Sequence, residues 1–181
     1  MPNHSRAFIR AGNLMTFAVS RRLTRSKLEL MDPSGSYEEA AMNPHAVHTD
    51  QAPAALGPYS QAIVAGGFVF CSGTAGIDPA TGEIPEGIEA QTEQALRNLS
   101  AILAAAGASM SDIVKTTIYY ANLADFATLN AVYAQHMPSP PPARSAPANV
   151  TLPRGLLISI EAIAKIPDDT QSPSADDGAH S

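Results

Sequence analysis

PPPARSAPANVTLPRGLLISIEAIA, residues 140–164, is the stretch from which we infer the organisation of this chain. Its prolines cannot continue a helix or donate to a sheet ladder, so they predict a stiff, extended approach to Arg144. Leu152–Gly155 is typical of a turn, and the apolar run Leu156–Ala164, with its isoleucines, predicts a largely buried strand. We therefore expect a buried, oriented Arg144 beside a strand. Its fork of N–H donors is suited to holding a carboxylate or a phosphate.

The composition indicates one globular domain of acidic character. The chain has 181 residues, 45% hydrophobic and 15% charged, with a formal net charge of −6. Six of the eleven basic residues lie in the first 27 positions, so no basic stripe in the remainder predicts nucleic-acid binding. No apolar run approaches the roughly 18 residues that a membrane span needs, so we expect no membrane partner and a cytoplasmic protein.

Several kinds of site are excluded by residue type and spacing. The single Cys71 can form no internal disulfide, which fits a reducing compartment, and in an apolar strand it is expected to be a small core residue. The five histidines form no metal-ligand motif. The glycines between residues 66 and 76 match no phosphate-binding pattern. We expect neither a metal nor a cofactor.

The two ends of the chain differ from its centre. Met1–Ala41 has no acid before Glu29 and no sustained period, and we interpret it as a disordered extension or as sequence upstream of a true start at Met42. Because it is basic and contains serine, an organellar transit peptide is the alternative. The tail 167–181, rich in Asp, Ser and Pro, is predicted to be disordered. One folded domain, residues 42–166, remains.

The domain is predicted to be α+β, in the order β-β-α-β-α-β-β, with two helices on one face of a mixed sheet. The predicted elements are antiparallel strands Ala62–Ala65 and Phe68–Gly73, helix Gly87–Ala106, strand Asp112–Tyr120, helix Leu123–Met137 and two strands within residues 140–164. Residues 42–57 are expected to be irregular, and residues 74–85 a loop. Because several strands are apolar on both sides, the face without helices predicts a homo-oligomer.

Helical and strand periods also assign faces. In the first helix Glu93 and Arg97 are spaced for an i,i+4 ion pair, and Gly107 is placed to end the helix. The inward positions are predicted to be Ile88, Thr92, Ala95, Leu96, Leu99, Ile102, Leu103 and Ala106 in the first helix, Val114, Thr116, Ile118 and Tyr120 in the third strand, and Phe126, Leu129, Tyr133 and Met137 in the second helix.

Three side chains are candidates for function, each with a simpler alternative. A lone arginine such as Arg144 is usually a surface ion-pair partner, but the proline approach favours an oriented head. Tyr59, after Gly-Pro, either packs on a turn or lines a pocket. Glu161 stands alone in an apolar strand and is expected to form a structural ion pair.

Five motifs in one order closely resemble the RidA/YjgF family of reactive-intermediate deaminases, over about residues 52–166. They are GPYSQAI (57–63), CSGTAGIDPATGEI (71–84), DIVKTTIYYANLADFATLNAVYAQHM (112–137), PARS (142–145) and LPRGLLISIEAIA (152–164). The resemblance implies the chorismate-mutase-like α+β fold. It also implies a homotrimer with a ligand cleft at each subunit interface.

The resemblance further implies hydrolysis of 2-imino acids or their enamine tautomers, such as 2-aminoacrylate, to 2-oxo acids and ammonia. Arg144 would grip the substrate carboxylate, the N–H of Ala146 would add a donor, and Tyr59 would line the pocket. The family pattern EIEAIA is SIEAIA here, so Ser159 replaces the glutamate that positions the attacking water. A serine is a far weaker base, and acid–base help is typically worth roughly 10²–10⁴-fold.

Two other functions remain open at this point. The first is a non-catalytic or redirected relative that keeps the Arg144 clamp and binds small carboxylates without turnover. The second is the ribonuclease or translation-inhibitor activity attached to some family members, against which the acidic domain argues.

Overall fold

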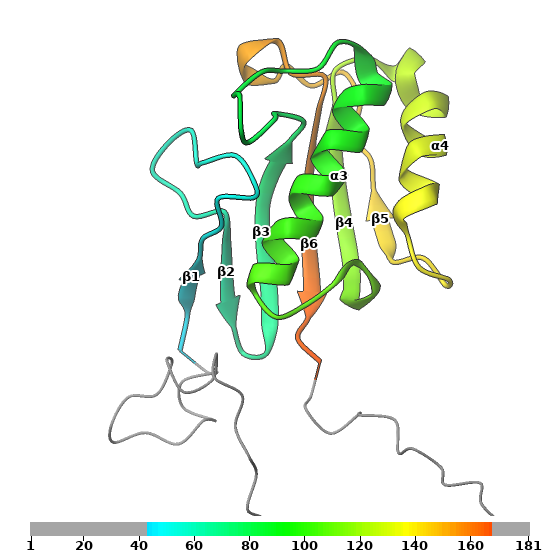
Figure 1. Ribbon diagram of the computed structural model, residues 1–181. Helices are drawn as coiled ribbons and strands as arrows, with labels where there is room; N and C mark the ends of the chain where they lie inside the picture. The colour runs from blue at the N-terminus through cyan, green and yellow to red at the C-terminus, as the bar shows by residue number, and fades with distance from the viewer. Residues whose placement is uncertain (1–42, 168–181) are drawn as a thin grey trace, which may run out of the picture.

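The structure, a computed structural model, describes residues 43–167 (Figure 1). The predicted extension Met1–Ala41, and all of the predicted tail except Pro167, lie outside the described residues. The domain boundaries therefore stay a prediction.

Six strands form one mixed sheet in the order β1-β2-β3-β6-β4-β5, and two α-helices accompany it (Figure 1). The elements are β1 (His45–Val47), β2 (Ala62–Ala65), β3 (Phe68–Ala75), α3 (Gly87–Ala105), η1 (Met110–Asp112), β4 (Ile113–Tyr120), η2 (Leu123–Asp125), α4 (Phe126–His136), β5 (Ala143–Ser145), η3 (Pro153–Gly155) and β6 (Ile158–Lys165). The predicted α+β class, the antiparallel β2–β3 hairpin and all of the predicted helices and strands are confirmed.

Strand β1 is an addition to the predicted order. It lies in the stretch expected to be irregular and pairs antiparallel with β2, His45 opposite Val64 and Val47 opposite Ala62. Three residues are too few to show a strand period, so its extended form comes from the neighbouring edge and not from its own sequence.

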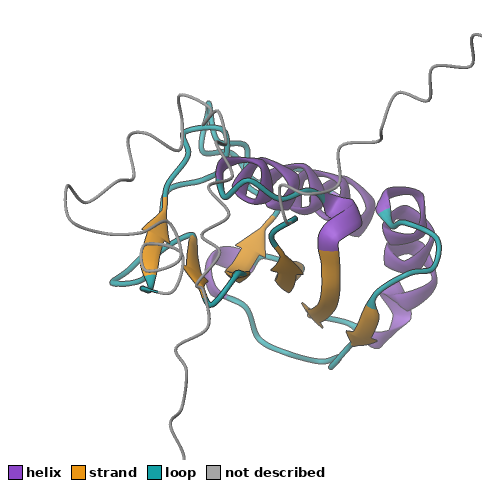
Figure 2. Cartoon of the chain, turned by 90° about the horizontal axis from the view of Figure 1, so that it is seen from below, coloured by secondary structure: helices purple, strands orange, loops and turns teal. Residues whose placement is uncertain are grey.

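Both helices lie on the same side of the sheet, as Figure 2 shows. Leu96, Leu99 and Leu103 of α3 are fully buried against Ile118 of β4 and Ile160 of β6 within one core cluster. The opposite side of the sheet carries no α-helix within the described residues (Figure 2). The one-layer arrangement of the helices therefore matches the prediction.

Buried polar side chains, which the period did not predict, attach α3 to its surroundings. Asn98 donates to the carbonyls of Ala75 (2.9 Å), the last residue of β3, and of Ile77 (2.8 Å), which follows it. Gln91 accepts from the N–H of Leu157 (2.8 Å) and donates to the carbonyl of Pro85 (3.1 Å). These bonds satisfy backbone groups that no ladder reaches.

The predicted end of α3 is confirmed in detail. Gly107 has φ +79°, and its N–H donates to the carbonyl of Ala104, while Ala108 N–H donates to Leu103. This pair of bonds is the Schellman motif, in which glycine takes the left-handed position without steric cost.

The assignment of Val114 to the inward face of β4 is wrong. The register against β6 shifts between Ile113 and Lys115, so Ile113 is buried while Val114 is exposed. A β-bulge of this kind inserts one residue and reverses the alternation on its far side.

The second helix is shorter than predicted. Residues Leu123–Asp125 form a 3₁₀ turn, with Asn122 Oδ1 accepting from Ala124 N–H at 3.0 Å, and α4 begins only at Phe126. Phe126 is exposed rather than inward, and Val132 is buried in addition to Leu129 and Tyr133. The change of helix type rotates the first turn relative to the remainder.

Candidate functional site

Arg144 lies in the middle of β5, which pairs parallel with the outer side of β4 and places Arg144 opposite Thr116. Its guanidinium carbon lies 4.9 Å from the centre of the Tyr133 ring and 5.9 Å from that of Phe126, both on α4. The expectation of an oriented head is confirmed, but the expectation of a buried one is wrong, because Arg144 is exposed in the single chain. β5 is an edge strand, and the side chain of Arg144 lies against α4.

The aromatic support under Arg144 is itself fixed. Tyr133 is buried, and its hydroxyl shares a 2.8 Å hydrogen bond with Thr116 Oγ1, which is fully buried on β4. Phe126 in turn lies 6.3 Å, centre to centre, from the buried ring of Tyr120. The guanidinium therefore lies beside rings that cannot turn away from it easily.

No carboxylate within residues 43–167 lies at ion-pair distance from Arg144. In the same range its guanidinium donates no hydrogen bond to another residue. An aromatic face attracts a cation but accepts none of its in-plane N–H bonds. The N–H donors of the guanidinium therefore remain available along its edge. A carboxylate can accept hydrogen bonds from two of them at once.

Tyr59 lies in the loop that precedes β2. Its side chain is 48% exposed, and its hydroxyl oxygen accepts from Leu56 N–H at 3.0 Å. It lines a shallow cavity together with Ser72 and Gly73 of β3. Of the two predicted roles for Tyr59, the lining of a cavity agrees with this position.

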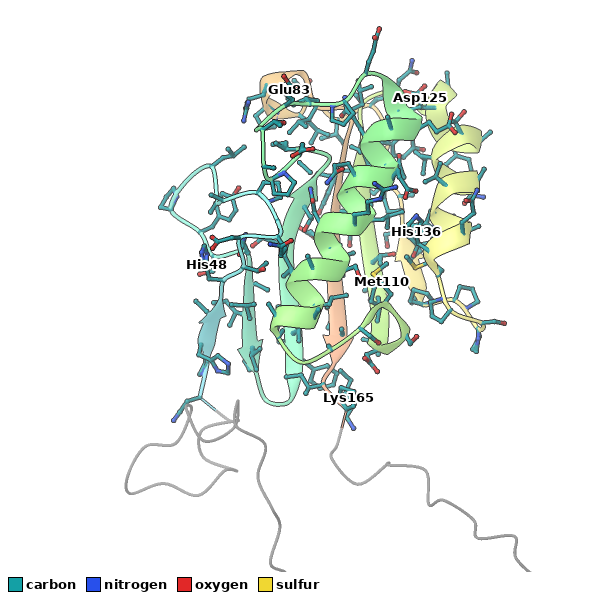
Figure 3. All side chains as sticks on the ribbon, in the orientation of Figure 1. His48, Glu83, Met110, Asp125, His136 and Lys165 are labelled. Atoms are coloured by element: carbon teal, nitrogen blue, oxygen red, sulfur yellow. The ribbon has the colours of Figure 1, made fainter. Side chains whose placement is uncertain are left out.

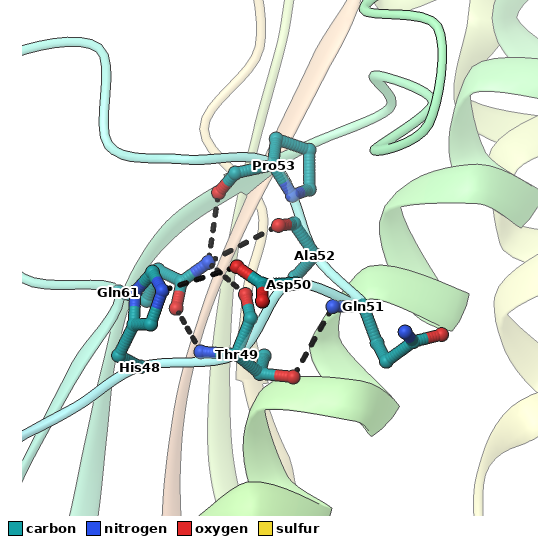
Figure 4. Close-up of polar contacts among 7 residues, drawn as sticks. All are labelled: His48, Thr49, Asp50, Gln51, Ala52, Pro53 and Gln61. Atoms are coloured by element: carbon teal, nitrogen blue, oxygen red, sulfur yellow. Dashed lines mark hydrogen bonds and ion pairs between the residues drawn. The ribbon is translucent and has the colours of Figure 1, made fainter.

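Gln61 shapes the same loop, a role that the sequence analysis did not assign (Figure 4). Its amide nitrogen donates to the carbonyls of Thr49, Ala52 and Pro53, and its oxygen accepts from Thr49 N–H at 2.8 Å. A buried amide that makes four bonds holds the loop in one conformation. No sequence pattern predicts this role of Gln61, because its hydrogen-bond partners are backbone groups.

Ser159 lies half-buried on β6, paired with Ala75 of β3 and with Tyr119 of β4. Its Oγ would come within 2.6 Å of a Cβ placed on Gly73, the residue that also lines the Tyr59 cavity. Glycine at position 73 therefore leaves the space in which the Ser159 hydroxyl lies.

One chain does not bring all the predicted site residues together. Arg144 and Ala146, a half-buried residue that follows β5, lie at one edge of the sheet, while Tyr59 lies beside β2. Four strand spacings separate β2 from β5, or about 19 Å. Within one chain, Arg144 and the cavity beside Tyr59 are therefore separate.

The remaining candidates have structural settings. Glu161 accepts a hydrogen bond from Tyr119 Oη at 3.4 Å rather than forming the expected ion pair, and its charge raises the pKa of Tyr119. Cys71 is buried, and burial raises its pKa to about 12, so it is a core thiol and not a nucleophile. In residues 43–167 no group of three His, Cys, Asp or Glu side chains could hold a metal ion. Nor is any helix there long and apolar enough to cross a bilayer.

Comparison with known proteins identifies the family. The family model described as Endoribonuclease L-PSP matches residues 49–166, nearly all of the described fold. The chain belongs to the RidA/YjgF family. The resemblance inferred from the five motifs is thereby confirmed.

Named relatives of the family align closely with this chain. It is 49% identical to Reactive Intermediate Deaminase A, chloroplastic, of Arabidopsis thaliana, over 72% of this chain and 71% of that protein. It is 44% identical to the 2-iminobutanoate/2-iminopropanoate deaminase of Mus musculus, over 65% of this chain and 88% of the relative.

Solved RidA/YjgF structures share the fold. RidA of the Antarctic bacterium Psychrobacter aligns with a TM-score of 0.66 at 45% identity, over 67% of this chain and 99% of that one. TdcF of E. coli, solved with bound serine, aligns with a TM-score of 0.64 at 41% identity, over 67% and 98% respectively. The predicted chorismate-mutase-like fold is confirmed.

Proposed function

We propose that this protein is a deaminase that hydrolyses 2-imino acids and their enamine tautomers, including 2-aminoacrylate, 2-iminopropanoate and 2-iminobutanoate, to 2-oxo acids and ammonia. The names of its relatives support this proposal. The observation that carries it is the Arg144 guanidinium, which rests against the Tyr133 ring with no carboxylate partner in residues 43–167.

The reaction needs little more than orientation. Arg144 holds the substrate carboxylate by two N–H bonds, and the N–H of Ala146 is the proposed additional donor. Water adds to the imine carbon to give a carbinolamine, whose C–N bond then breaks to release ammonia and leave the 2-oxo acid. Because the imine carbon is already electrophilic, holding it in place supplies much of the rate enhancement.

Ser159 is the proposed partner of the attacking water. A hydroxyl accepts and donates hydrogen bonds at any pH near neutrality, so it orients water without removing its proton efficiently. We therefore expect slower turnover than a glutamate at this position would give. Tyr59 closes the pocket from the side of the Gly73 cavity.

A second copy of the chain is needed to complete the site, and the proposed assembly is a homotrimer. Two observations support it: Arg144 and the cavity beside Tyr59 are about 19 Å apart within one subunit, and the sheet face without helices exposes 44% of Phe70. Packing of that face against other copies covers it and brings Arg144 of one subunit beside Tyr59 of the next.

The proposal is tested by generating 2-iminopropanoate or 2-iminobutanoate in situ with an amino-acid oxidase, in the presence of semicarbazide. A deaminase competes with semicarbazide for the imine, so wild-type protein lowers semicarbazone formation in proportion to its concentration. Semicarbazone formation equal to that of a protein-free control contradicts the proposal.

The alternative of binding without turnover keeps the same clamp. It predicts no competition for imine but saturable binding of 2-oxobutanoate, measured by calorimetry. The substitution of Ser159 for glutamate is the feature that favours it.

A ribonuclease role, which the name of the matching family model raises, is a separate alternative. It requires RNA binding that weakens steeply with salt. The excess of acids over bases in residues 42–166 opposes it.

The proposed location is the cytoplasm, with organellar import as the alternative. The relative from Arabidopsis thaliana is described as chloroplastic, and the first 28 residues of this chain, which are basic and contain no acid, have the composition of a transit peptide. The intact mass of the native protein decides between a retained and a removed leader.

A further inference from the structure

We propose that Tyr133, held by Thr116, is a positioning residue that sets the direction of the Arg144 guanidinium. This inference rests on the proposed function, since the direction of the guanidinium matters only if Arg144 grips a substrate carboxylate. It assigns a role to two residues, Thr116 and Tyr133, that the sequence predicts only as inward-facing positions of a strand and a helix.

Arg144 is restrained by α4 and not by its own strand. Position 144 is exposed, and β5 has only three residues at the edge of the sheet. Of the two rings beside its guanidinium, Tyr133 is nearer, at 4.9 Å. A flexible arginine with no anionic partner would otherwise sample many rotamers, each at an entropic cost on binding.

The Tyr133 ring has a fixed direction. Its hydroxyl and Thr116 Oγ1 share a buried 2.8 Å hydrogen bond, so the ring cannot tilt without leaving two buried oxygens unpaired. Thr116 and Arg144 are also paired residues of β4 and β5. One position in the ladder therefore fixes the ring and the start of the arginine side chain together.

An aromatic ring, unlike a carboxylate, restrains Arg144 without occupying its N–H donors. A carboxylate partner would hold Arg144 as firmly but would compete with the substrate for the same donors. A ring beneath the guanidinium attracts its charge and leaves its edge open. The arrangement gives a preorganised clamp that is vacant until an imino acid arrives.

The main variant is Tyr133→Leu, which removes the ring and keeps an apolar side chain of helix-forming type. We expect KM for 2-iminopropanoate to rise about tenfold, with a smaller fall in kcat. Tyr133→Phe keeps the ring and loses only the hydroxyl, so KM should return to within about threefold of wild type. Thr116→Val should resemble Tyr133→Phe. Equal KM values for wild type and Tyr133→Leu overturn the proposal.

Two comparisons separate positioning from general loss of structure. Val132→Ala thins the buried face of the same helix without touching Arg144, so it should lower Tm and leave KM unchanged. In an Arg144→Ala background, Tyr133→Leu should have no further effect on KM, because the ring acts through the arginine. A tenfold effect that persists in that background overturns the proposal.

A readout that needs no turnover distinguishes this inference from the proposed function. The side-chain Nε–Hε signal of Arg144, assigned by its absence in Arg144→Lys, should be displaced by the ring current of Tyr133. It should shift in Tyr133→Leu and stay in place in Tyr133→Phe. If wild type hydrolyses no imine while the signal shifts as described, the proposed function fails and the positioning stands. An Arg144 signal that is the same in wild type and Tyr133→Leu overturns the positioning.

Discussion

Arg144 combines exposure to solvent with restraint by aromatic rings, and that combination suits a group that waits for an anionic ligand. The proline run before it indicated a stiff backbone, but the restraint on the guanidinium comes from α4. Because no acidic side chain in residues 43–167 pairs with Arg144, its N–H donors are available to a substrate carboxylate.

At Ser159 the departure from the family pattern makes a prediction about rate. Ser159→Glu should raise kcat for 2-iminopropanoate by about 10- to 100-fold, because a carboxylate can take a proton from water near neutral pH and a hydroxyl cannot. Ser159 is half-buried on the face without helices, beside Gly73. The measurement is steady-state kinetics by semicarbazone competition.

Ser159→Gln is the matched control for that variant. It has the size of glutamate and no basic group, so it should not raise kcat. If Ser159→Gln accelerates the reaction as much as Ser159→Glu, the explanation by general base fails.

Individual site residues could be predicted only as far as their motifs reached. Arg144 and Ser159 were identified from short motifs, whereas Tyr133 was predicted only as a core residue. Its place beneath Arg144 depends on the parallel pairing of β4 with β5, and sequence spacing does not reveal that pairing. The structural role of Gln61 could not be predicted from the sequence, because its hydrogen-bond partners are main-chain groups.

At the scale of elements, the segment after β3 packs against α3 with almost no clearance. A Cβ on Gly76 would overlap with main-chain atoms of Gln91, and Gly76 has an ordinary φ. Gly76→Ala should therefore destabilise the fold by about 2 kcal/mol or more through overpacking, seen as a lower Tm. Gly57→Ala, whose Cβ would make ordinary 3.7 Å contacts, is the control and should change stability by less than about 0.5 kcal/mol. Equal Tm values for the two variants would contradict this packing.

The two helices are joined by a hydrogen bond between His136 and Glu93 that depends on pH. Glu93 on α3 contacts His136 Nε2 at 2.7 Å and Arg97 Nε at 3.0 Å, and Figure 3 shows His136 on α4 between the two helices. The hydrogen bond from His136, followed by attraction to His136 and Arg97, lowers the pKa of Glu93. A lowered pKa means that the carboxylate stabilises the fold above its ordinary pKa and ceases to do so as pH falls through the lowered value.

Glu93→Gln should therefore cost stability at pH 7 and progressively less below about pH 4.5. The cost at pH 7 is at most about 1 kcal/mol, because a third of the Glu93 side chain is exposed and solvent screens the pair. Urea unfolding of both proteins between pH 3 and pH 7 measures the difference. A difference that does not shrink on acidification would contradict the role of the carboxylate charge.

Elements with a long period could be predicted, and short or shifted ones could not. The nineteen residues of α3 show the helical period over five turns, so its bounds were predicted to within a residue. The three residues of β1 have no period of their own, and the bulge after Ile113 moves Val114 off the inward face. Both exceptions are set by neighbouring strands.

At the scale of the whole molecule, the sheet face opposite the helices is the surface that we expect other copies of the chain to cover. It presents Phe70 beside Lys115 and Glu161, around a cavity. Phe70→Lys should weaken the proposed homotrimer, because it replaces an apolar side chain of the packed face by a charge that must be desolvated. Light scattering after gel filtration should give three times the chain mass for wild type and a lower mass for the variant. A wild-type protein that is monomeric at micromolar concentration would contradict the assembly.

In the proposed reaction, the Arg144 guanidinium holds the carboxylate of an imino acid for hydrolysis. The most direct test is kcat/KM for 2-iminopropanoate, measured for wild type, Arg144→Lys and Arg144→Ala. We predict a fall of at least about 100-fold in Arg144→Ala, and an intermediate fall in Arg144→Lys, which keeps the charge without the two-point geometry. Arg144→Ala with the kcat/KM of wild type would contradict the account.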